Sequence, residues 1–370
     1  ISKNKSEIQK NYNQLFVGVE IMKKIGAGYL NIEMLPDDRI KTFASIIKQV
    51  EEIREAAAEY YEGGYYKVDS VVREDTAHNN ISILGERGSG KTSFLLTILR
   101  HLEYRSIIKA ESLKKERINE IKRISEVNST NKNLEEIKDV EPNSLNYVMK
   151  IIDPDKFNAE NDVLGWVIFQ FEDVLEKEGI LKDNIGEYCS EMKLLAEKVK
   201  KNYEELKRYY IKSKENYLRS VSGVLASNSE LASAREDIFK SDTKLYEKIE
   251  VFINKFVELL KEKYDKQPLF FISFDDIDLA PEKTFQILTT IMNYLNHHPI
   301  VVFILGNESS FKEAVLIDIF KKDNIPRIFD KNDEIIEDRP LLNNRNQRAW
   351  EFIFKILPET FKYNLNEFDI

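Results

Sequence analysis

The feature that most constrains the fold is the octapeptide GERGSGKT at Gly85–Thr92, which matches the pattern G-x-x-x-x-G-K-[ST]. The residues before it, 79–84 (NNISIL), have the apolar character of a short buried strand, and a helix is expected from Lys91 to about His101. A strand, a glycine-rich loop and a helix in this order form the local structure of a phosphate-binding P-loop. Chance would produce the pattern in roughly one chain of this length per hundred.

Each residue type in this loop has a physical reason to be there. Glycines let backbone N–H groups turn toward phosphate oxygens, and the start of the following helix adds a positive dipole end. Lys91 is expected to reach the β- and γ-phosphates as a catalytic cation, and the Thr92 hydroxyl to ligate Mg²⁺. The residues expected to contact the nucleotide are Gly85, Glu86, Arg87, Gly88, Ser89, Gly90, Lys91, Thr92 and Ser93.

A second motif, LFFISFDDID at 269–278, places acidic residues directly after an apolar run. In an open α/β sheet this is the carboxyl edge, where ligands bind. We expect Asp275 to hold Mg²⁺, and Asp276 to orient the attacking water as a catalytic residue, with Asp278 able to share that role. Many ATPases carry glutamate at the position of Asp276, so the shorter side chain predicts slow hydrolysis. The alternative is a cluster of aspartates that caps the strand end.

Two weaker patterns could complete the site. Asn307 ends the apolar run IVVFILGN, where a polar side chain could contact the γ-phosphate or the attacking water; an ordinary turn residue explains it equally well. Four arginines could stabilise charge on a neighbouring subunit's γ-phosphate, although each is more simply a surface residue. They are Arg327, Arg339, Arg345 and Arg348.

Continuous apolar strands alternate with amphipathic helices, which predicts an α/β fold with a parallel sheet covered on both faces. Further strands are expected at 147–154, from Pro268, from Pro299 and at 361–365, and helices at 37–61, 242–264 and 283–296. We divide the chain into an N-terminal helical segment, 1–68, and an ATPase domain, 69–370. The domain is interrupted by charged helical insertions at about 104–141 and 180–240, and the small residues at 221–234 suggest a linker or mobile tip.

Composition excludes several classes of protein. The net charge of −9 argues against a strongly basic nucleic-acid-binding protein. A single cysteine, Cys189, allows no internal disulfide and fits a cytoplasmic protein. The longest apolar runs are far too short to span a bilayer. Because the sequence starts at Ile1 rather than Met and stops just after a predicted strand, we expect a fragment of a longer protein.

Taken in order, the P-loop, a strand with I-D-P, D-D-x-D and a strand ending in Asn resemble the AAA+ and STAND branch of P-loop ATPases over roughly residues 70–330. The resemblance implies a five-stranded sheet in the order 5-1-4-3-2, ATP and Mg²⁺ as cofactors, and a homo-oligomeric ring with nucleotide between subunits.

A narrower resemblance joins four segments. NISILGERGSGKTS, VMKIIDPDKF, FISFDDID and AWEFIFKILPETFKYNL are similar to the ATPase subunit of RADAR-type anti-phage systems. That similarity implies an oligomeric ATPase switch or motor that works with an adenosine deaminase partner. The long interval of 184 residues between Lys91 and Asp275, 275 minus 91, departs from the branch and must hold the insertions.

Two other functions stay open. A nucleic-acid-handling ATPase, related to origin-recognition or clamp-loader proteins, requires a basic face. The lysines and arginines at 109–123 alternate with glutamates instead, as in a solvated helix. A scaffold that binds ATP without turnover gains weight from Asp276 in place of glutamate.

Overall fold

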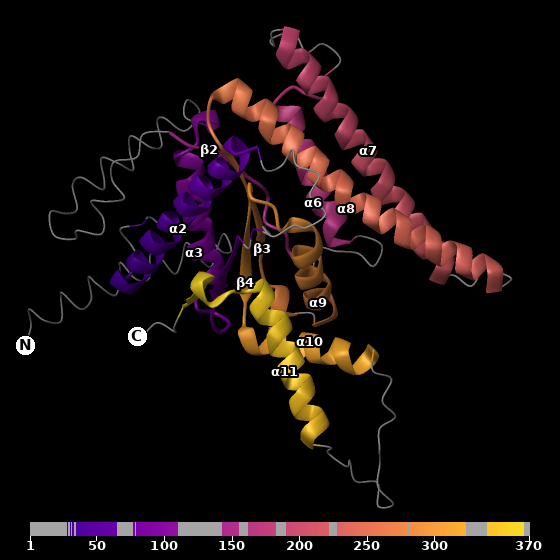
Figure 1. Cartoon of the computed structure of the whole chain (residues 1–370). Helices are drawn as coiled ribbons and strands as arrows, with labels where there is room; N and C mark the ends of the chain where they lie inside the picture. Colours follow the sequence, from indigo (N-terminus) through magenta and orange to yellow (C-terminus); the bar gives the residue numbers. More distant parts are fainter. Residues whose placement is uncertain are drawn as a thin grey trace, which may run out of the picture.

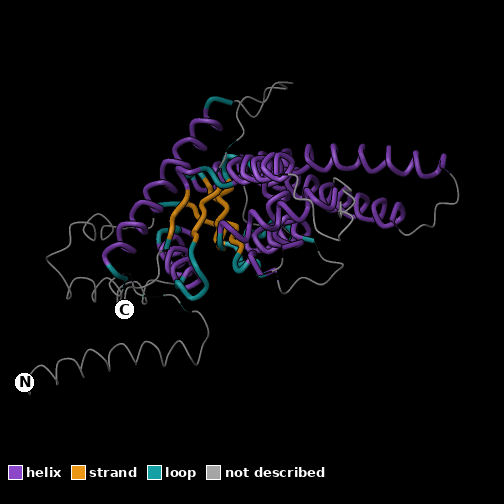
Figure 2. The backbone as a smooth tube through the Cα atoms, turned by 90° about the horizontal axis from the view of Figure 1, so that it is seen from below, coloured by secondary structure: helices purple, strands orange, loops and turns teal. Residues whose placement is uncertain are grey.

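The computed structural model places five parallel strands in one sheet between two layers of helices (Figures 1 and 2). The strand order is β2-β3-β4-β1-β5, which read from the β5 edge is 5-1-4-3-2. The strands are β1 (Asn80–Leu84), β2 (Leu145–Val148), β3 (Pro268–Phe274), β4 (Ile300–Gly306) and β5 (Lys362–Asn364). The structure describes residues 28, 30, 32, 35–64, 77, 79–109, 143–154, 162–182, 190–221, 228–279, 281–322 and 339–365. The α/β class with a parallel sheet is thus confirmed.

Every residue of the three central strands β1, β3 and β4 is buried, because helices cover both faces of the sheet. On one face lie α2 (Asp37–Glu62) and α3 (Lys91–Tyr104), coloured indigo and purple in Figure 1. Their buried Phe43, Phe94 and Ile98 pack against Phe271 and Phe303 of the sheet. The helix that follows the P-loop is therefore fixed on the sheet by its own apolar side.

The opposite face is covered by a larger group of helices. These are α6 (Val163–Lys177), α7 (Ser190–Val221), α8 (Asn228–Tyr264), α9 (Pro281–Thr290), α10 (Glu308–Lys322) and α11 (Arg339–Ile356). The helix α9 continues as one π-helical turn, Ile291–Leu295. Short 3₁₀ turns occur at Ile107–Lys109, Ile277–Leu279 and Glu359–Phe361.

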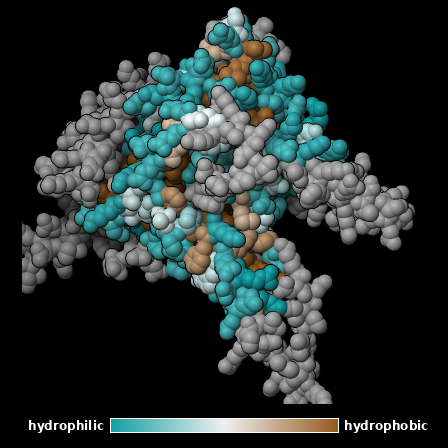
Figure 3. Space-filling model, viewed as in Figure 1, coloured by the Kyte–Doolittle hydropathy of each residue, from teal (hydrophilic) through white to brown (hydrophobic). Residues whose placement is uncertain are grey.

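The long helices α7 and α8 lie side by side and extend beyond the sheet (Figures 1 and 2). The buried side chains that α8 presents follow the stripe expected from sequence: Leu245, Ile249, Phe252, Ile253, Phe256, Val257 and Leu260. The surface over this side of the molecule is mostly hydrophilic, with apolar side chains in small patches (Figure 3). We refer to α7 and α8 together as the helical hairpin.

The structure corrects several expected boundaries. The helix predicted from about 242 begins at Asn228, so 228–234 is helical rather than a linker. Its first turns are rich in Ala, Glu, Leu and Arg, which all have high helix propensity, and this favours helix over a flexible linker. The strand expected at 147–154 spans only Leu145–Val148; beyond it, Ile152 makes a single bridge with Phe274. The helices α10 and α11 were not predicted.

Part of the expected organisation lies outside the described residues. This holds for most of the segment 1–68 before α2, for 110–142 of the first insertion with its charged cluster, and for 222–227. In the segment 180–240, residues 190–221 belong to α7 and 228–240 to α8, which runs well past residue 240.

Candidate nucleotide-binding site

The P-loop joins β1 to α3 and has a backbone that only glycine adopts easily. Gly88 and Gly90 have positive φ angles of 87° and 83°. A side chain in this left-handed region costs about 1–2 kcal/mol. Gly85 is needed for a different reason: a Cβ there would lie 2.6 Å from the carbonyl oxygen of Leu365 and 2.7 Å from Ser89 Oγ. Gly88 and Gly90 are therefore needed for their backbone conformation, whereas Gly85 is needed because a side chain there has no space.

The Lys91 side chain folds back into the loop instead of pointing to solvent. Its Nζ donates hydrogen bonds to the carbonyl oxygens of Gly85 (2.8 Å) and Glu86 (3.0 Å). The residue is buried, with 7% of its surface exposed. Ser89 Oγ is also buried and has no hydrogen-bond partner among the described residues. An ammonium, a hydroxyl and a glycine-lined backbone thus converge inside one turn.

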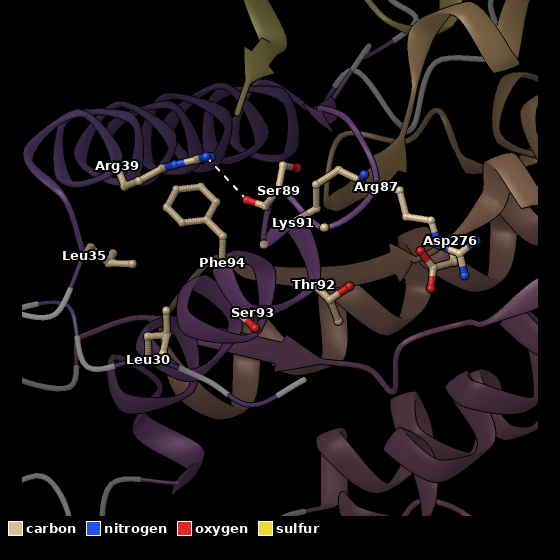
Figure 4. A pocket seen from close by; sticks show the side chains of 12 residues that line it. Leu30, Leu35, Arg39, Arg87, Ser89, Lys91, Thr92, Ser93, Phe94 and Asp276 are labelled. Atoms are coloured by element: carbon tan, nitrogen blue, oxygen red, sulfur yellow. Dashed lines mark hydrogen bonds between the residues drawn. The ribbon is translucent and has the colours of Figure 1, made fainter. Parts of the chain in front are cut away.

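A cavity of about 270 Å³ opens beside the loop (Figure 4). One end is polar and includes Lys91, Thr92 and Asp276, whereas the other is apolar and formed by Leu30, Leu35 and Phe94. Leu30 is held against α3 by two hydrogen bonds with Thr97 Oγ1, at 2.9 and 3.2 Å. A nucleotide also has a charged end and an apolar face, so the two ends of the cavity match its chemistry.

Arg39 of α2 lines the same cavity. Its guanidinium donates to the carbonyl oxygen of Ser89 at 3.4 Å, the contact drawn in Figure 4, and 4% of the residue is exposed. Burial lowers the pKa of Arg39, opposed by the charge of Asp38. Nothing in the sequence marks Arg39, Leu30 or Leu35 as cavity residues, because a helical stripe does not show which upstream residue reaches a loop 50 positions away.

The acidic end of β3 lies next to the P-loop, as the motif order predicts. The Asp275 carboxylate accepts a hydrogen bond from the backbone N–H of Asp276 at 3.0 Å. Burial raises the pKa of Asp275, while the nearby hydroxyl of Thr92 lowers it. The two residues expected to hold Mg²⁺ are therefore neighbours at this edge of the sheet.

Asp276 has an unusual backbone conformation, with a positive φ of 50°. Its pKa is raised by burial and by the negative charge of Asp278, and lowered by Lys91. The left-handed conformation is uncommon outside glycine and is favoured most by Asp and Asn among other residues. It turns the chain sharply between the sheet and Ile277–Leu279, so Asp276 enters the cavity with Lys91.

One acidic residue of this site was not assigned a role from sequence. Asp153 follows β2 in the I-D-P segment, and its negative charge raises the pKa of both Asp275 and Asp276. Its position beyond the end of the neighbouring strand, at the same sheet edge, was the available sequence signal.

Asn307 lies at the end of β4, between the P-loop and the acidic edge. The Gly85 N–H donates to the carbonyl oxygen of Gly306 at 3.1 Å, which brings Asn307 beside the loop. Asn307 Nδ2 donates to Glu86 Oε1 at 2.9 Å, and its Oδ1 accepts from the N–H of Ser309 at 2.9 Å. Asn307 is therefore both a partner of the loop and the cap of α10.

The donor set fits a magnesium–nucleotide complex. The loop presents glycine N–H groups and an ammonium for phosphate, and Thr92 with Asp275 presents two oxygen ligands of the kind Mg²⁺ prefers. Within the described ranges, no group of three or more His, Cys, Asp or Glu side chains could hold a metal by itself. Mg²⁺ usually retains waters and phosphate oxygens, so two protein ligands suffice.

The two candidate arginines with described side chains, Arg345 and Arg348, are not among the cavity residues. Arg345 lies 4.9 Å from the ring centroid of Phe320, and both Arg345 and Arg348 belong to α11. Arg327 and the side chain of Arg339 lie outside the described residues. The arginines that do line the cavity are Arg39 and Arg87, which belong to the same chain as the loop.

No family model matches the chain, and no curated protein matches it. Among the described helices, none has a stretch long and apolar enough to cross a membrane.

Proposed function

We propose that this protein binds ATP with Mg²⁺ and hydrolyses it as a P-loop ATPase. The observation that carries the proposal is the convergence of the P-loop and the acidic strand end on one cavity, which Lys91, Thr92 and Asp276 line together. Thr92 also lies close enough to Asp275 to lower the pKa of its carboxyl. Alone, the first motif could be a simple glycine turn and the second a capping aspartate; a hydroxyl and a carboxylate beside a buried lysine are the arrangement that a metal–phosphate complex needs.

Each residue then has a distinct role. The P-loop N–H groups and the Lys91 ammonium bind and orient the phosphates, and Thr92 with Asp275 holds the metal. Bound Mg²⁺ would neutralise charge on the phosphate oxygens. Asp276, whose pKa is raised by burial, accepts a proton from or orients the attacking water, and Asn307 donates hydrogen bonds at the same edge. ATP is favoured over GTP because the sequence lacks an N-K-x-D motif.

The test is calorimetric titration of the purified chain with ATP, with and without Mg²⁺, together with phosphate release. Lys91→Ala is expected to lower affinity and turnover about 100-fold or more, since it removes the buried ammonium that folds back into the turn. Lys255→Ala is the matched control, because its ammonium pairs with Glu258 on α8, a helix that contributes no residue to the cavity. A wild-type chain that neither binds nor hydrolyses ATP in any assembly state would contradict the proposal.

A second candidate is a scaffold that retains ATP without turnover. The observation in its favour is Asp276, which is one methylene shorter than glutamate and has its carboxyl pKa raised by burial and by Asp278. Asp276→Glu distinguishes the two: turnover that rises in the variant supports a slow enzyme, whereas tight binding with no turnover in either form supports the scaffold.

The resemblance to the AAA+ and STAND branch extends the proposal to assembly. A P-loop at the rim of a sheet in the order 5-1-4-3-2 supports an oligomeric switch or motor, and we propose a homo-oligomeric ring that acts in the cytoplasm. The narrower similarity to RADAR-type systems adds an adenosine deaminase partner and a role in phage defence. Particle imaging with a non-hydrolysable ATP analogue tests the ring, and co-purification with such a deaminase tests the partner.

A further inference from the structure

The amide of Asn307 has its orientation fixed by two neighbours. Its Oδ1 accepts from the N–H groups of Ser309 (2.9 Å) and Ser310 (3.4 Å) at the start of α10. A flipped amide would point its own donors at those N–H groups, so the oxygen must face the helix and Nδ2 must face the P-loop. Asn307 therefore offers the nucleotide site a donor and never an acceptor.

In this structure the donor is used by a carboxylate of the P-loop itself. Asn307 Nδ2 donates to Glu86 Oε1 at 2.9 Å. The backbone carbonyl of the same residue accepts from Lys91 Nζ at 3.0 Å. Glu86 thus receives one hydrogen bond from each of two groups that the proposed function assigns to the phosphates.

A carboxylate and a terminal phosphate are chemically alike for these donors. Both are anionic oxygen acceptors, and hydrogen bonds to either are stronger than those to neutral oxygens. Nδ2 carries two N–H groups, but an anion bound to one of them repels a second anion that approaches the other, because both acceptors are then held close to the same nitrogen. The negative charge of Glu86 therefore weakens binding of the terminal phosphate more than binding of the inner phosphates.

We propose that Glu86 sets the preference of the site between nucleoside triphosphate and diphosphate, by competing with the terminal phosphate for Asn307 Nδ2. This inference rests on the proposed function and assigns a role within that site. Binding a triphosphate transfers Asn307 from Glu86 to phosphate, whereas a diphosphate leaves the Glu86–Asn307 bond in place. Glu86 thereby weakens triphosphate binding selectively, and Asn307 reports the exchange to α10 through the helix cap.

The test compares affinities of a non-hydrolysable ATP analogue and of ADP, each with Mg²⁺, for the wild-type chain, Glu86→Gln and Glu86→Ala. Glu86→Gln removes the charge but keeps an acceptor, and Glu86→Ala removes both. The ratio of analogue affinity to ADP affinity is expected to rise about threefold in Glu86→Gln and about tenfold in Glu86→Ala. Glu258→Gln, in which a carboxylate paired with Lys255 on α8 is neutralised, is expected to keep the wild-type ratio.

A double-mutant cycle separates exchange of the hydrogen bond from a general effect of charge. In the Asn307→Ala background, the effect of Glu86→Ala on the ratio is expected to fall at least about threefold, because the shared donor is gone. An undiminished effect would show that Glu86 acts without Asn307 and would overturn the exchange. Thermal midpoints with each nucleotide give a second measure of the same ratio.

Three further outcomes separate the role of Glu86 from the proposed binding of nucleotide. If the wild-type chain binds nucleotide and both Glu86 variants keep its ratio, the competition is overturned and the nucleotide site stands. If both variants instead lower the ratio, Glu86 assists the triphosphate and the sign of the proposal is wrong. If no variant binds either nucleotide, the proposed function and the competition fail together.

Discussion

The P-loop and the helical hairpin are built on opposite principles. The loop, residues 85–92, depends on individual atoms: left-handed glycines, one buried ammonium and a hydroxyl beside a carboxylate. The hairpin, α7 with α8, depends on the summed burial of many apolar side chains. Substitutions in the first region should change chemistry with a modest effect on folding, and substitutions in the second should do the reverse.

The largest expected effect is on stability, at the base of the hairpin. Phe256 is fully buried and stacks on Phe252 and Phe270 with ring centroids 5.7 and 5.4 Å apart. Phe256→Ala is expected to lower the free energy of unfolding by about 3–5 kcal/mol, from lost transfer energy and a cavity. Val251→Ala, at an exposed position of the same helix, is the control for denaturant titrations. A cost below about 1 kcal/mol for Phe256→Ala would contradict distributed packing as the source of stability.

The next effect is on chemistry. Asp275→Asn removes the carboxylate beside Thr92 and is expected to lower Mg²⁺-dependent turnover about 100-fold, or about 2.7 kcal/mol of transition-state stabilisation. Because burial raises the pKa of Asp275, its ionised form opposes folding at neutral pH, and the neutral amide should not lower the thermal midpoint. Phosphate release and thermal denaturation on the same samples would check both parts. If Asp275→Asn instead lost stability and kept its turnover, Asp275 would serve folding rather than chemistry.

A smaller effect tests whether loop geometry can be separated from folding. Gly85→Ala forces a Cβ to within 2.6 Å of the Leu365 carbonyl, so either β5 or the loop must move. We expect a cost of about 1–3 kcal/mol in unfolding free energy and about tenfold weaker ATP binding. Gly64→Ala, in the turn after α2, is the control with the opposite defect: φ is +70°, so the variant strains the backbone, but a Cβ there meets no atom within 4 Å. If both variants bind ATP equally well, the close approach at Gly85 is unimportant.

The smallest effect is expected at a polar contact of the hairpin. Lys248 Nζ and Glu205 Oε2 are 2.5 Å apart, with both side chains about a quarter exposed, and the hydrogen bond lowers the pKa of Glu205. Lys248→Met is expected to change the unfolding free energy by less than about 1 kcal/mol, since exposed ion pairs contribute little. Nucleotide affinity should be unchanged. An effect on ATP binding would show that the hairpin is coupled to the loop.

The same contrast explains what the sequence could predict. GERGSGKT and the acids after β3 were identifiable because each motif is a single short stretch of sequence, and the local backbone of each positions its functional groups. The core strands followed from their apolar runs. The wall formed by Leu30, Leu35 and Arg39 did not, because it depends on how α2 packs over α3.

Errors in the helices have a related origin. The start of α8 was misplaced because the small residues at 231–234 resemble a linker, whereas Ala is also the residue with the highest helix propensity. The helix α10 shows little amphipathic pattern because it is partly enclosed by α9 and α11, so periodicity gave no clear boundary.

The buried guanidinium of α2 ties the nucleotide loop to something outside the strand–turn–helix unit in which it is encoded. Arg39 donates a hydrogen bond directly to the carbonyl oxygen of Ser89, so a shift of α2 along its own axis would move the loop without first deforming the sheet. The position of α2 and the conformation of the P-loop are therefore coupled.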